Sequence, residues 1–591
     1  MFWLFILLSV SIVFPKEKLI QNSDARKIFL LNGNWNIIID PYETGFYTYR
    51  LTPDNNGFFK NSRPKNKYER IEYDFDKSEK LKVPGDWNTQ KEKLFLYEGT
   101  VWYKKSFNYY KQKDNRVFIY FGAVNYNCKV YLNGEFVGEH IGGFTPFNFE
   151  ISDKLISGPN FIVVKVDNKR IPEGVPTINT DWWNYGGITR DVKLIETDST
   201  FIIDYLVQLK KNSKDKITVW IQLDGENFDD VQFKIPELNI DIKLTPDKNG
   251  KCSFDIDCLP ILWSPENPKL YKIIIQHKDE IIKDKIGFRK IEEKENKIYL
   301  NDKEIFLRGV SLHEEVPIKS SRANSKKDAR KLLSMSKELN CNFVRLAHYP
   351  HNENIIKEAD KLGFLVWSEI PVYWTIHWQN KSTFENASNQ LKEMISRDKN
   401  RSSIIFWSVG NETPLSDERL SFMKSLIDTA RLLDSTRLIT AALETHYVNP
   451  KTIMINDPLG KYLDVLGCNE YIGWYDGLPN KADTIEWKTT YDKPLVISEF
   501  GADAMFGFHA DSLTIWSEEF QENVYKHQIK MLNKISFLSG ISPWILIDFR
   551  SPRRTLPGIQ DYFNRKGLYS NLGEKKKAFY ILKNFYKSKM N

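Results

Sequence analysis

The sequence is poor in cysteine and has no recognisable metal-binding spacing. Its 591 residues include five cysteines, an odd number, which are scattered apart from the Cys252 and Cys258 pair. They form neither a disulfide framework nor a zinc pattern. Oxygen ligands are likewise not grouped at a spacing typical of calcium or magnesium sites. The sequence therefore predicts no metal and no required cofactor.

A strong charge of one sign is also missing. The 84 basic and 77 acidic residues leave a formal net charge of +7, and the lysines form only short runs such as residues 575–577. A surface that binds nucleic acid would need a basic stripe or patch. Nucleic acid is therefore not an expected partner.

Long apolar runs are absent except at the N-terminus. Residues 2–14 are apolar apart from Ser9 and Ser11. This run is too short to span a bilayer and fits the hydrophobic part of a secretory signal. The positive stretch and the small-x-small cleavage site of such signals are lacking, so a buried N-terminal strand is the alternative. We expect residues 1–22 to be a signal peptide and the mature chain to be secreted or periplasmic, without a membrane partner.

Aromatic residues, in contrast, are plentiful, at 14% of the chain with 16 Trp and 28 Tyr. They suit sugar-binding sites and equally the packing of large β domains.

The length exceeds what one core usually holds, which favours roughly three or four domains. Residues 23–196 contain short strands separated by turns. One hairpin, VYLNGEFVG, has Asn133 and Gly134 where a type I′ turn needs positive φ, and the whole segment predicts a jelly-roll β-sandwich.

The rest of the chain divides into two parts. Residues 197–289 hold further strands, and a block of roughly ninety residues suits an immunoglobulin-like β-sandwich. Residues 290–591 alternate apolar strands with amphipathic helices, such as those expected at 326–339, 352–362, 418–433, 517–535 and 574–586. The strand candidates are IFLRGVSLH, FVRLAHY, FLVWSEI, IIFWSVGNE, LITAAL, DVLGCNEY, LVISEFG and SPWILIDF. Eight strand–helix steps without a glycine-rich nucleotide turn predict a (β/α)8 TIM barrel.

Two glutamates end apolar strands of this predicted barrel. Glu412 ends SIIFWSVGNE and Glu499 ends PLVISE, which are strands four and seven by our count. The active site of such a barrel lies at the carboxyl ends of its strands. A single carboxylate there can be part of a structural ion pair, but two on different strands are what glycoside cleavage needs. One protonates the leaving oxygen, and the other attacks the anomeric carbon or, at a wider separation, activates water.

Eight motifs together resemble glycoside hydrolase family 2, which contains β-glucuronidases, β-galactosidases and β-mannosidases. The similarity runs from about residue 32 to residue 586. The motifs, in chain order, are VPGDWN, GTVWYKKSF, GGFTPFNFEI, WNYGGITRDV, RGVSLHEE, VRLAHYPHNE, FWSVGNET and ISEFGAD. The resemblance implies a retaining glycosidase with a carbohydrate substrate. Homo-oligomers are common in the family, so a homo-oligomer is a candidate assembly.

The resemblance also implies residue roles. Glu412 matches the acid/base and Glu499 the nucleophile, while Asn411 matches the residue that bonds the sugar 2-hydroxyl and Tyr471 the tyrosine that orients the nucleophile. Three further residues at the strand ends have weaker matches or none. His348 and Trp544 resemble pocket residues whose alternative is packing of the barrel rim, and His313 contacts either the substrate or a structural partner.

Glu369, which lies in WSEIP at the end of a predicted strand, is interpreted as a structural carboxylate.

The prediction of the substrate depends on the segment FNRKG near the C-terminus. A uronic acid carries a carboxylate at C6, which needs a cationic or amide partner. β-Glucuronidases have an Asn-x-Lys motif here, so Asn564 and Lys566 resemble its carboxylate clamp and Tyr475 a further contact. The sequence is therefore most similar to β-glucuronidases and predicts release of terminal β-D-glucuronic acid.

The segment before this motif departs from the family pattern. Gln560 stands four residues before Asn564, where an arginine would be expected, and Arg553 or Arg554 could replace it. One alternative is a β-galactosidase in which residues 564–566 are a solvated loop. Another is a carbohydrate-binding protein that kept the fold and lost catalysis.

Overall fold

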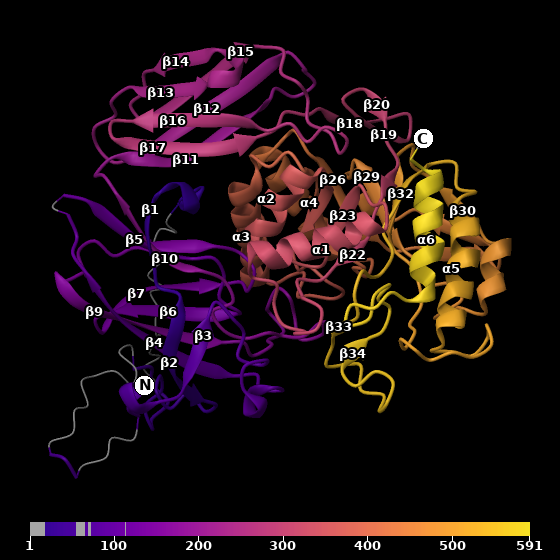
Figure 1. The fold of residues 1–591 in the computed structure, drawn as a ribbon, viewed down its shortest axis with the longest axis horizontal. Helices are drawn as coiled ribbons and strands as arrows, with labels where there is room; N and C mark the ends of the chain where they lie inside the picture. The colour runs from indigo at the N-terminus through magenta and orange to yellow at the C-terminus, as the bar shows by residue number, and fades with distance from the viewer. Residues whose placement is uncertain (1–17, 55–65, 69–72, 113, 591) are drawn as a thin grey trace, which may run out of the picture.

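The computed structural model describes residues 18–54, 66–68, 73–112 and 114–590. Residues 1–17 of the expected signal peptide lie outside the described residues. Two β-sandwiches lie along one side of an α/β barrel (Figure 1). This architecture confirms the predicted jelly-roll, immunoglobulin-like and TIM-barrel folds. No helix in the described part of the chain is long and apolar enough to cross a membrane.

The first sandwich packs two antiparallel sheets around a core of buried tryptophan, valine and isoleucine side chains. Its four-stranded sheet has the order β1 (Lys27–Leu30), β10 (Val192–Thr197), β5 (Arg116–Phe121) and β8 (Phe147–Glu150). Its six-stranded sheet has the order β3 (Lys80–Val83), β2 (Gly33–Asp40), β4 (Thr100–Tyr109), β9 (Gly158–Asp167), β6 (Asn127–Leu132) and β7 (Glu135–Ile141). The predicted hairpin joins β6 to β7, with φ of 53° at Asn133 and 91° at Gly134.

The second sandwich follows directly and has a core of its own. One sheet has the order β11 (Phe201–Leu209), β12 (Lys216–Asp224) and β15 (Lys251–Asp257). The other has the order β14 (Ile240–Leu244), β13 (Val231–Ile235), β16 (Tyr271–His277) and β17 (Glu280–Ile286). Every second residue of β12 is buried, because successive side chains of a strand point to opposite faces.

The barrel is one parallel sheet that closes on itself. Its order is β21 (Leu307–Arg308), β32 (Leu538–Ile541), β31 (Leu495–Glu499), β29 (Val465–Asn469), β26 (Leu438–Leu443), β25 (Ile404–Asn411), β24 (Leu365–Glu369), β23 (Phe343–Leu346) and β22 (Ser311–Leu312). The two ends of this order, β21 and β22, are halves of the first barrel strand. A small sheet precedes them, formed by β18 (Ile291–Lys294), β19 (Lys297–Leu300) and β20 (Lys303–Glu304).

Helices surround the barrel after most strands. They are α1 (Lys326–Glu338), α2 (Glu353–Leu362), α3 (Lys381–Asp398), α4 (Asp417–Leu433), α5 (Glu518–Leu532) and α6 (Lys577–Ser588). The prediction of a helix at every step was wrong after β26 and β29. There the described chain forms 3-10 turns that begin at Pro458 and Pro479, and the three strands β27 (His446–Asn449), β28 (Thr452–Ile455) and β30 (Glu486–Thr489).

The last barrel strand also differs from the prediction. The sequence SPWILIDF was expected as strand eight, but the strand is β32, which ends at Ile541 just before it. Pro543 has no N–H for the strand ladder, so the chain leaves the sheet there. Trp544 therefore lies just beyond the strand end. Further on, β33 (Phe549–Arg550) and β34 (Phe563–Asn564) form a small antiparallel pair.

Candidate active site

The two glutamates singled out in the sequence lie at the same end of the barrel. Glu499 is the last residue of β31 and is 5% exposed. Glu412 directly follows β25, whose residues are all buried. Its φ of 47° places it in the left-handed region, which bulky residues rarely adopt. The backbone therefore turns sharply at Glu412, directly after the strand ends at the mouth of the barrel.

Both oxygens of Glu499 have hydrogen-bond donors. The Arg345 guanidinium donates to Oε1 at 2.7 Å, and the Tyr471 hydroxyl donates to Oε2 at 2.6 Å. His348 Nε2 lies 3.6 Å from the same Oε1. The carboxylate is thus fixed in orientation, and Arg345 supplies a compensating positive charge.

Arg345 was missed by the sequence interpretation. It is fully buried on β23 and also donates to Glu369 at 3.0 Å and to Asn411 Oδ1 at 2.7 Å. Burial alone would raise the pKa of Glu369, but the charge of Arg345 and a hydrogen bond to His348 lower it to about 2. An arginine inside the apolar strand FVRL was the available signal, because a buried charge must be paired.

Glu412 has a different environment from Glu499. The Trp374 indole Nε1 donates to Glu412 Oε2 at 2.9 Å, and Asn411 Nδ2 lies 3.4 Å from the same oxygen. Burial, and then the negative charge of Glu499, raise the pKa of Glu412 to about 7. Near neutral pH, Glu412 can therefore carry a proton and give it up again, which is what an acid/base group needs.

Aromatic rings form one wall beside this pair. The rings of His348 and Trp544 are stacked with centroids 4.7 Å apart, and Trp182 from the first sandwich lies 5.6 Å from His348. His313 packs 4.2 Å from Phe549 and shares a hydrogen bond with the Tyr349 hydroxyl at 3.0 Å. Burial lowers the pKa of His313 well below its ordinary value, which keeps the ring neutral.

The segment FNRKG also reaches this rim. Asn564 and Lys566 are each 1% exposed, so the segment is not a solvated loop. Lys566 Nζ is 2.5 Å from Asp503 Oδ2 and donates to the Tyr475 hydroxyl at 2.9 Å. Burial alone would lower the pKa of Lys566, but the charge of Asp503 raises it.

A residue of the first sandwich completes this second group. Asp181 accepts hydrogen bonds from Ser551 Oγ at 2.6 Å, from Arg554 Nε at 3.1 Å and from Asn564 Nδ2 at 3.3 Å. Neither Asp181 nor Asp503 was identified from the sequence as a site residue, although Asp503 lies in the motif ISEFGAD. The carboxylates of Asp181 and Asp503 therefore accept hydrogen bonds from donor groups that could also bind a ligand.

The other residues before the motif have separate positions. The Arg553 guanidinium lies over the Trp374 ring at 4.7 Å from its centroid and donates to Asn179 Oδ1 at 3.1 Å. Gln560 is 8% exposed, and its side-chain oxygen accepts from the Leu556 backbone N–H at 3.4 Å. Gln560 thus supports a turn, while Arg553 and Arg554 both lie on the rim.

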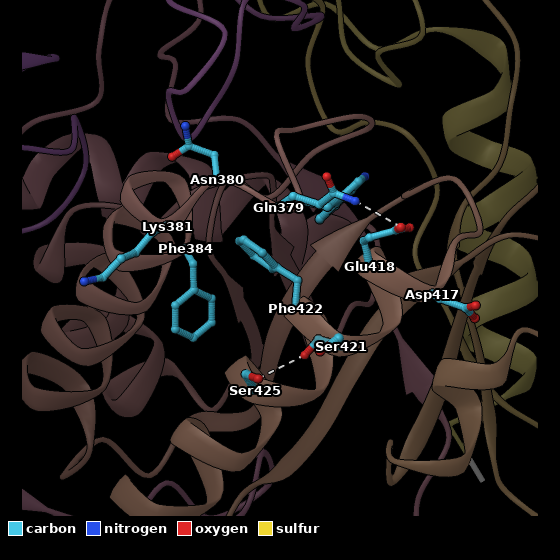
Figure 2. A pocket seen from close by; sticks show the side chains of 10 residues that line it. Gln379, Asn380, Lys381, Phe384, Asp417, Glu418, Ser421, Phe422 and Ser425 are labelled. Atoms are coloured by element: carbon cyan, nitrogen blue, oxygen red, sulfur yellow. Dashed lines mark hydrogen bonds between the residues drawn. The ribbon is translucent and has the colours of Figure 1, made fainter.

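The barrel also has an open groove of about 610 Å³. Figure 2 shows the side chains that line it. It is formed where α3 and α4 begin, and the rings of Trp378 and Phe384 both pack against the Phe422 ring there. The Gln379 amide donates to Glu418 at 3.0 Å across it. Neither Glu412 nor Glu499 lines this groove.

Comparisons with known proteins agree with this architecture. Three family models match the chain: "Glycosyl hydrolases family 2, sugar binding domain" at residues 30–198, "Glycosyl hydrolases family 2" at 190–289 and "Glycosyl hydrolases family 2, TIM barrel domain" at 291–549. Beta-glucuronidase of Paenibacillus borealis is 26% identical over 97% of this chain and 98% of its own length. Beta-glucuronidase of Rattus norvegicus is 27% identical over 97% of this chain and 92% of its own length. The solved beta-D-glucuronidase of Dictyoglomus thermophilum superposes with a TM-score of 0.77 at 26% identity, covering 97% of this chain and 98% of that chain.

Proposed function

Because the chain belongs to glycoside hydrolase family 2, we propose that it is a retaining exo-glycosidase that releases terminal β-D-glucuronic acid from glucuronides and glucuronic-acid-containing oligosaccharides. The observation that carries the substrate choice is the convergence of Asn564, Lys566 and Arg554 on the rim that holds Glu412 and Glu499. Its relatives in Paenibacillus borealis and Rattus norvegicus are called beta-glucuronidases, which supports this choice.

The first chemical step uses both glutamates. Glu499 attacks the anomeric carbon while Glu412 gives its proton to the leaving oxygen, so one C–O bond forms and the glycosidic C–O bond breaks. The product is an ester between the sugar and Glu499, together with the released alcohol. The pKa of Glu412, raised to about 7 by burial and by the charge of Glu499, suits proton donation near neutral pH.

The second step restores the enzyme. Esterification removes the negative charge of Glu499, which lowers the pKa of Glu412 and lets it act as a base. Glu412 takes a proton from water, the water oxygen attacks the anomeric carbon, and Glu499 leaves as the carboxylate. Two inversions at one carbon give net retention. Arg345 and Tyr471 orient the free Glu499 carboxylate for attack by their hydrogen bonds.

The remaining residues bind the sugar in this proposal. Asn411 faces the 2-hydroxyl, and His348 and Trp544 form the wall beside the ring. Asn564, Lys566 and the Tyr475 hydroxyl hold the C6 carboxylate, with Arg554 adding positive charge. A charge-assisted hydrogen bond in a buried site contributes more than a neutral one, so this group can separate a uronic acid from its parent hexose.

The test is a pair of assays on 4-nitrophenyl β-D-glucuronide and 4-nitrophenyl β-D-galactoside. We expect kcat/KM to be at least about 100-fold higher for the glucuronide than for the galactoside, since the C6 carboxylate gains charge-assisted contacts. Faster cleavage of the galactoside would favour a β-galactosidase instead. No cleavage of either substrate, together with binding of saccharides, would favour a non-catalytic carbohydrate-binding protein.

We further propose that the chain is exported, as a secreted or periplasmic protein. The apolar run at residues 2–14 supports this proposal. Expression of the full chain in a bacterial host, followed by N-terminal sequencing of the mature product, tests it. A product that retains Met1 and stays inside the cell would contradict it. Light scattering on the same material measures whether the chain forms a homo-oligomer.

A further inference from the structure

Lys566, Arg554 and Arg553 lie on the active-site rim, and Arg553 differs from the other two. Lys566 is paired with Asp503, and Arg554 is paired with Asp181. Arg553 is exposed and has no carboxylate partner among the residues that the structure describes. Its positive charge is therefore available to a ligand, whereas the charges of Lys566 and Arg554 are each shared with a carboxylate of the protein.

Arg553 is nevertheless held in place. Its guanidinium lies over the Trp374 ring at 4.7 Å, and its Nη1 donates to Asn179 Oδ1 of the first sandwich at 3.1 Å. Its backbone N–H donates to Ser551 Oγ at 3.3 Å. A cation over an indole ring is oriented as well as attracted. Arg553 would thus lose little conformational freedom on binding a ligand.

Trp374 contacts both Arg553 and the proposed acid/base Glu412. The indole Nε1 donates to Glu412 Oε2 at 2.9 Å, and the Trp374 backbone N–H donates to the Asn411 carbonyl at 3.0 Å. The acid/base must reach the oxygen that leaves, so a side chain bonded to it lies on the leaving-group side of the scissile bond. The Tyr373 ring also packs against Trp374, with centroids 4.4 Å apart. Arg553 is therefore the charged group over this indole.

We propose that Arg553 is a specificity-determining residue for an anionic group on the sugar that leaves. This inference rests on the proposed function and adds a second recognition site to it, separate from the Lys566 clamp. A guanidinium can bind a carboxylate or a sulfate through two parallel hydrogen bonds. The favoured substrates are then acidic saccharides in which the released glucuronic acid is linked to a uronic acid or to a sulfated sugar.

The experiment compares four substrates with a terminal β-D-glucuronic acid. They are 4-nitrophenyl β-D-glucuronide and three disaccharides whose leaving sugar is neutral, carboxylated or sulfated. We expect the parent protein to show kcat/KM about tenfold or more higher for one or both acidic disaccharides than for the neutral one. In Arg553→Gln this preference should vanish, while values for the neutral disaccharide and the nitrophenyl substrate stay within about twofold. The carboxylated and sulfated arms separate the two sources of negative charge.

Two controls identify the cause. Arg330→Gln removes one positive charge from α1, where Arg330 is paired with Glu358 far along the chain from the rim residues, and should keep the preference. Raising the salt concentration should weaken the preference of the parent, because Arg553 is exposed and its field is screened. Salt should affect the neutral disaccharide less, because its one charge binds at the buried Lys566 clamp.

Three results would overturn the inference and leave the proposed function in place. The parent could cleave all three disaccharides equally, or Arg553→Gln could lower turnover of the neutral and acidic substrates alike, which would make Arg553 only a structural cap on Trp374. Retention of the preference in Arg553→Gln would also exclude it. Failure of the parent to cleave any glucuronide would overturn the proposed function, and this inference with it.

Discussion

The rim of the barrel has two regions that are built in different ways. The first contains Glu412 and Glu499, and every residue that bonds them comes from a barrel strand or the residues just after one. The second contains Asn564 and Lys566, whose partners come from the first sandwich and from two separate loops. The region of Glu412 and Glu499 is therefore built on the closed sheet. The geometry of the region of Asn564 and Lys566 depends instead on contacts between loops and between domains.

In the proposed function, this difference separates the residues that cut the glycosidic bond from the residues that select the sugar. Strand register positions Glu412 and Glu499. Once the barrel sheet closes, the ends of their strands lie at the same face and bring the two glutamates together. The second region needs Asp181 of the first sandwich to reach Arg554 and Ser551, and the Trp183 N–H to bond the Arg550 carbonyl at 3.1 Å. Substitutions in the first region should therefore stop turnover of every substrate. Substitutions in the second should change which substrate is turned over.

The largest effect is expected for the proposed nucleophile. Glu499→Gln should lower kcat by on the order of 10⁵-fold or more, because no sugar–enzyme ester can form. Binding of a glucuronide, measured by calorimetry, should remain. Glu486→Gln, an exposed residue of β30, is the matched control and should keep full activity. Substantial turnover by Glu499→Gln would show that another residue attacks the sugar.

A smaller effect that depends on pH is expected for Glu412, the proposed acid/base. Glu412→Gln should lower kcat/KM by about 100- to 10,000-fold, and least for 4-nitrophenyl substrates, whose leaving group needs little protonation. The raised pKa of about 7 means that Glu412 is protonated below this pH and loses its proton above it. In the parent, kcat/KM should therefore fall as the pH rises through about 7. This alkaline decline should be absent from the Glu412→Gln profile, and its persistence there would assign it to another group.

The two regions also differ in how far the sequence predicted them. Glu412 and Glu499 could be placed because each ends an apolar strand, and the strands of a parallel barrel all open at one end. Arg345 carried a readable signal, a charge inside an apolar strand, that was not used. Trp544 was assigned to a strand that ends before it, since the effect of Pro543 on the ladder was overlooked.

The second region could be predicted only in part. Asn564 and Lys566 were found through a family motif, but their partners were not. Asp181 is 383 positions away from Asn564, and no local pattern reports a contact over such a distance. The same limit applies to Arg553 and Arg554, which are adjacent in sequence and yet pack against Trp374 and Asp181 respectively.

The Lys566–Asp503 pair tests whether the second region selects the substrate. Lys566→Met alone should destabilise the fold by about 3–5 kcal/mol, because it leaves a buried carboxylate without its cation. The double variant Lys566→Gln/Asp503→Asn keeps the volume and removes both charges, so it should fold. Its kcat/KM for 4-nitrophenyl β-D-glucuronide should fall about 100-fold relative to the parent.

The galactoside rate of the double variant should stay within about twofold of the parent rate. Thermal denaturation of both variants separates loss of fold from loss of recognition. Glucuronide turnover at the parent rate in a folded double variant would exclude Lys566 as a carboxylate ligand.

The smallest effect is expected at Arg554. This residue of the barrel domain pairs with Asp181 of the first sandwich and so connects the two domains in the second region. Arg554→Ala should raise KM for the glucuronide about tenfold with little change in kcat, since it removes a charge near the clamp and leaves both glutamates in place. Asp181 keeps hydrogen bonds from Ser551 and Asn564, so the fold should persist. Arg553→Ala is the matched control, because its guanidinium lies over Trp374, and it should leave KM for 4-nitrophenyl β-D-glucuronide unchanged. Equal, unchanged kinetics in both variants would mean that neither arginine replaces the one missing at Gln560, and that Asn564 and Lys566 recognise the carboxylate alone.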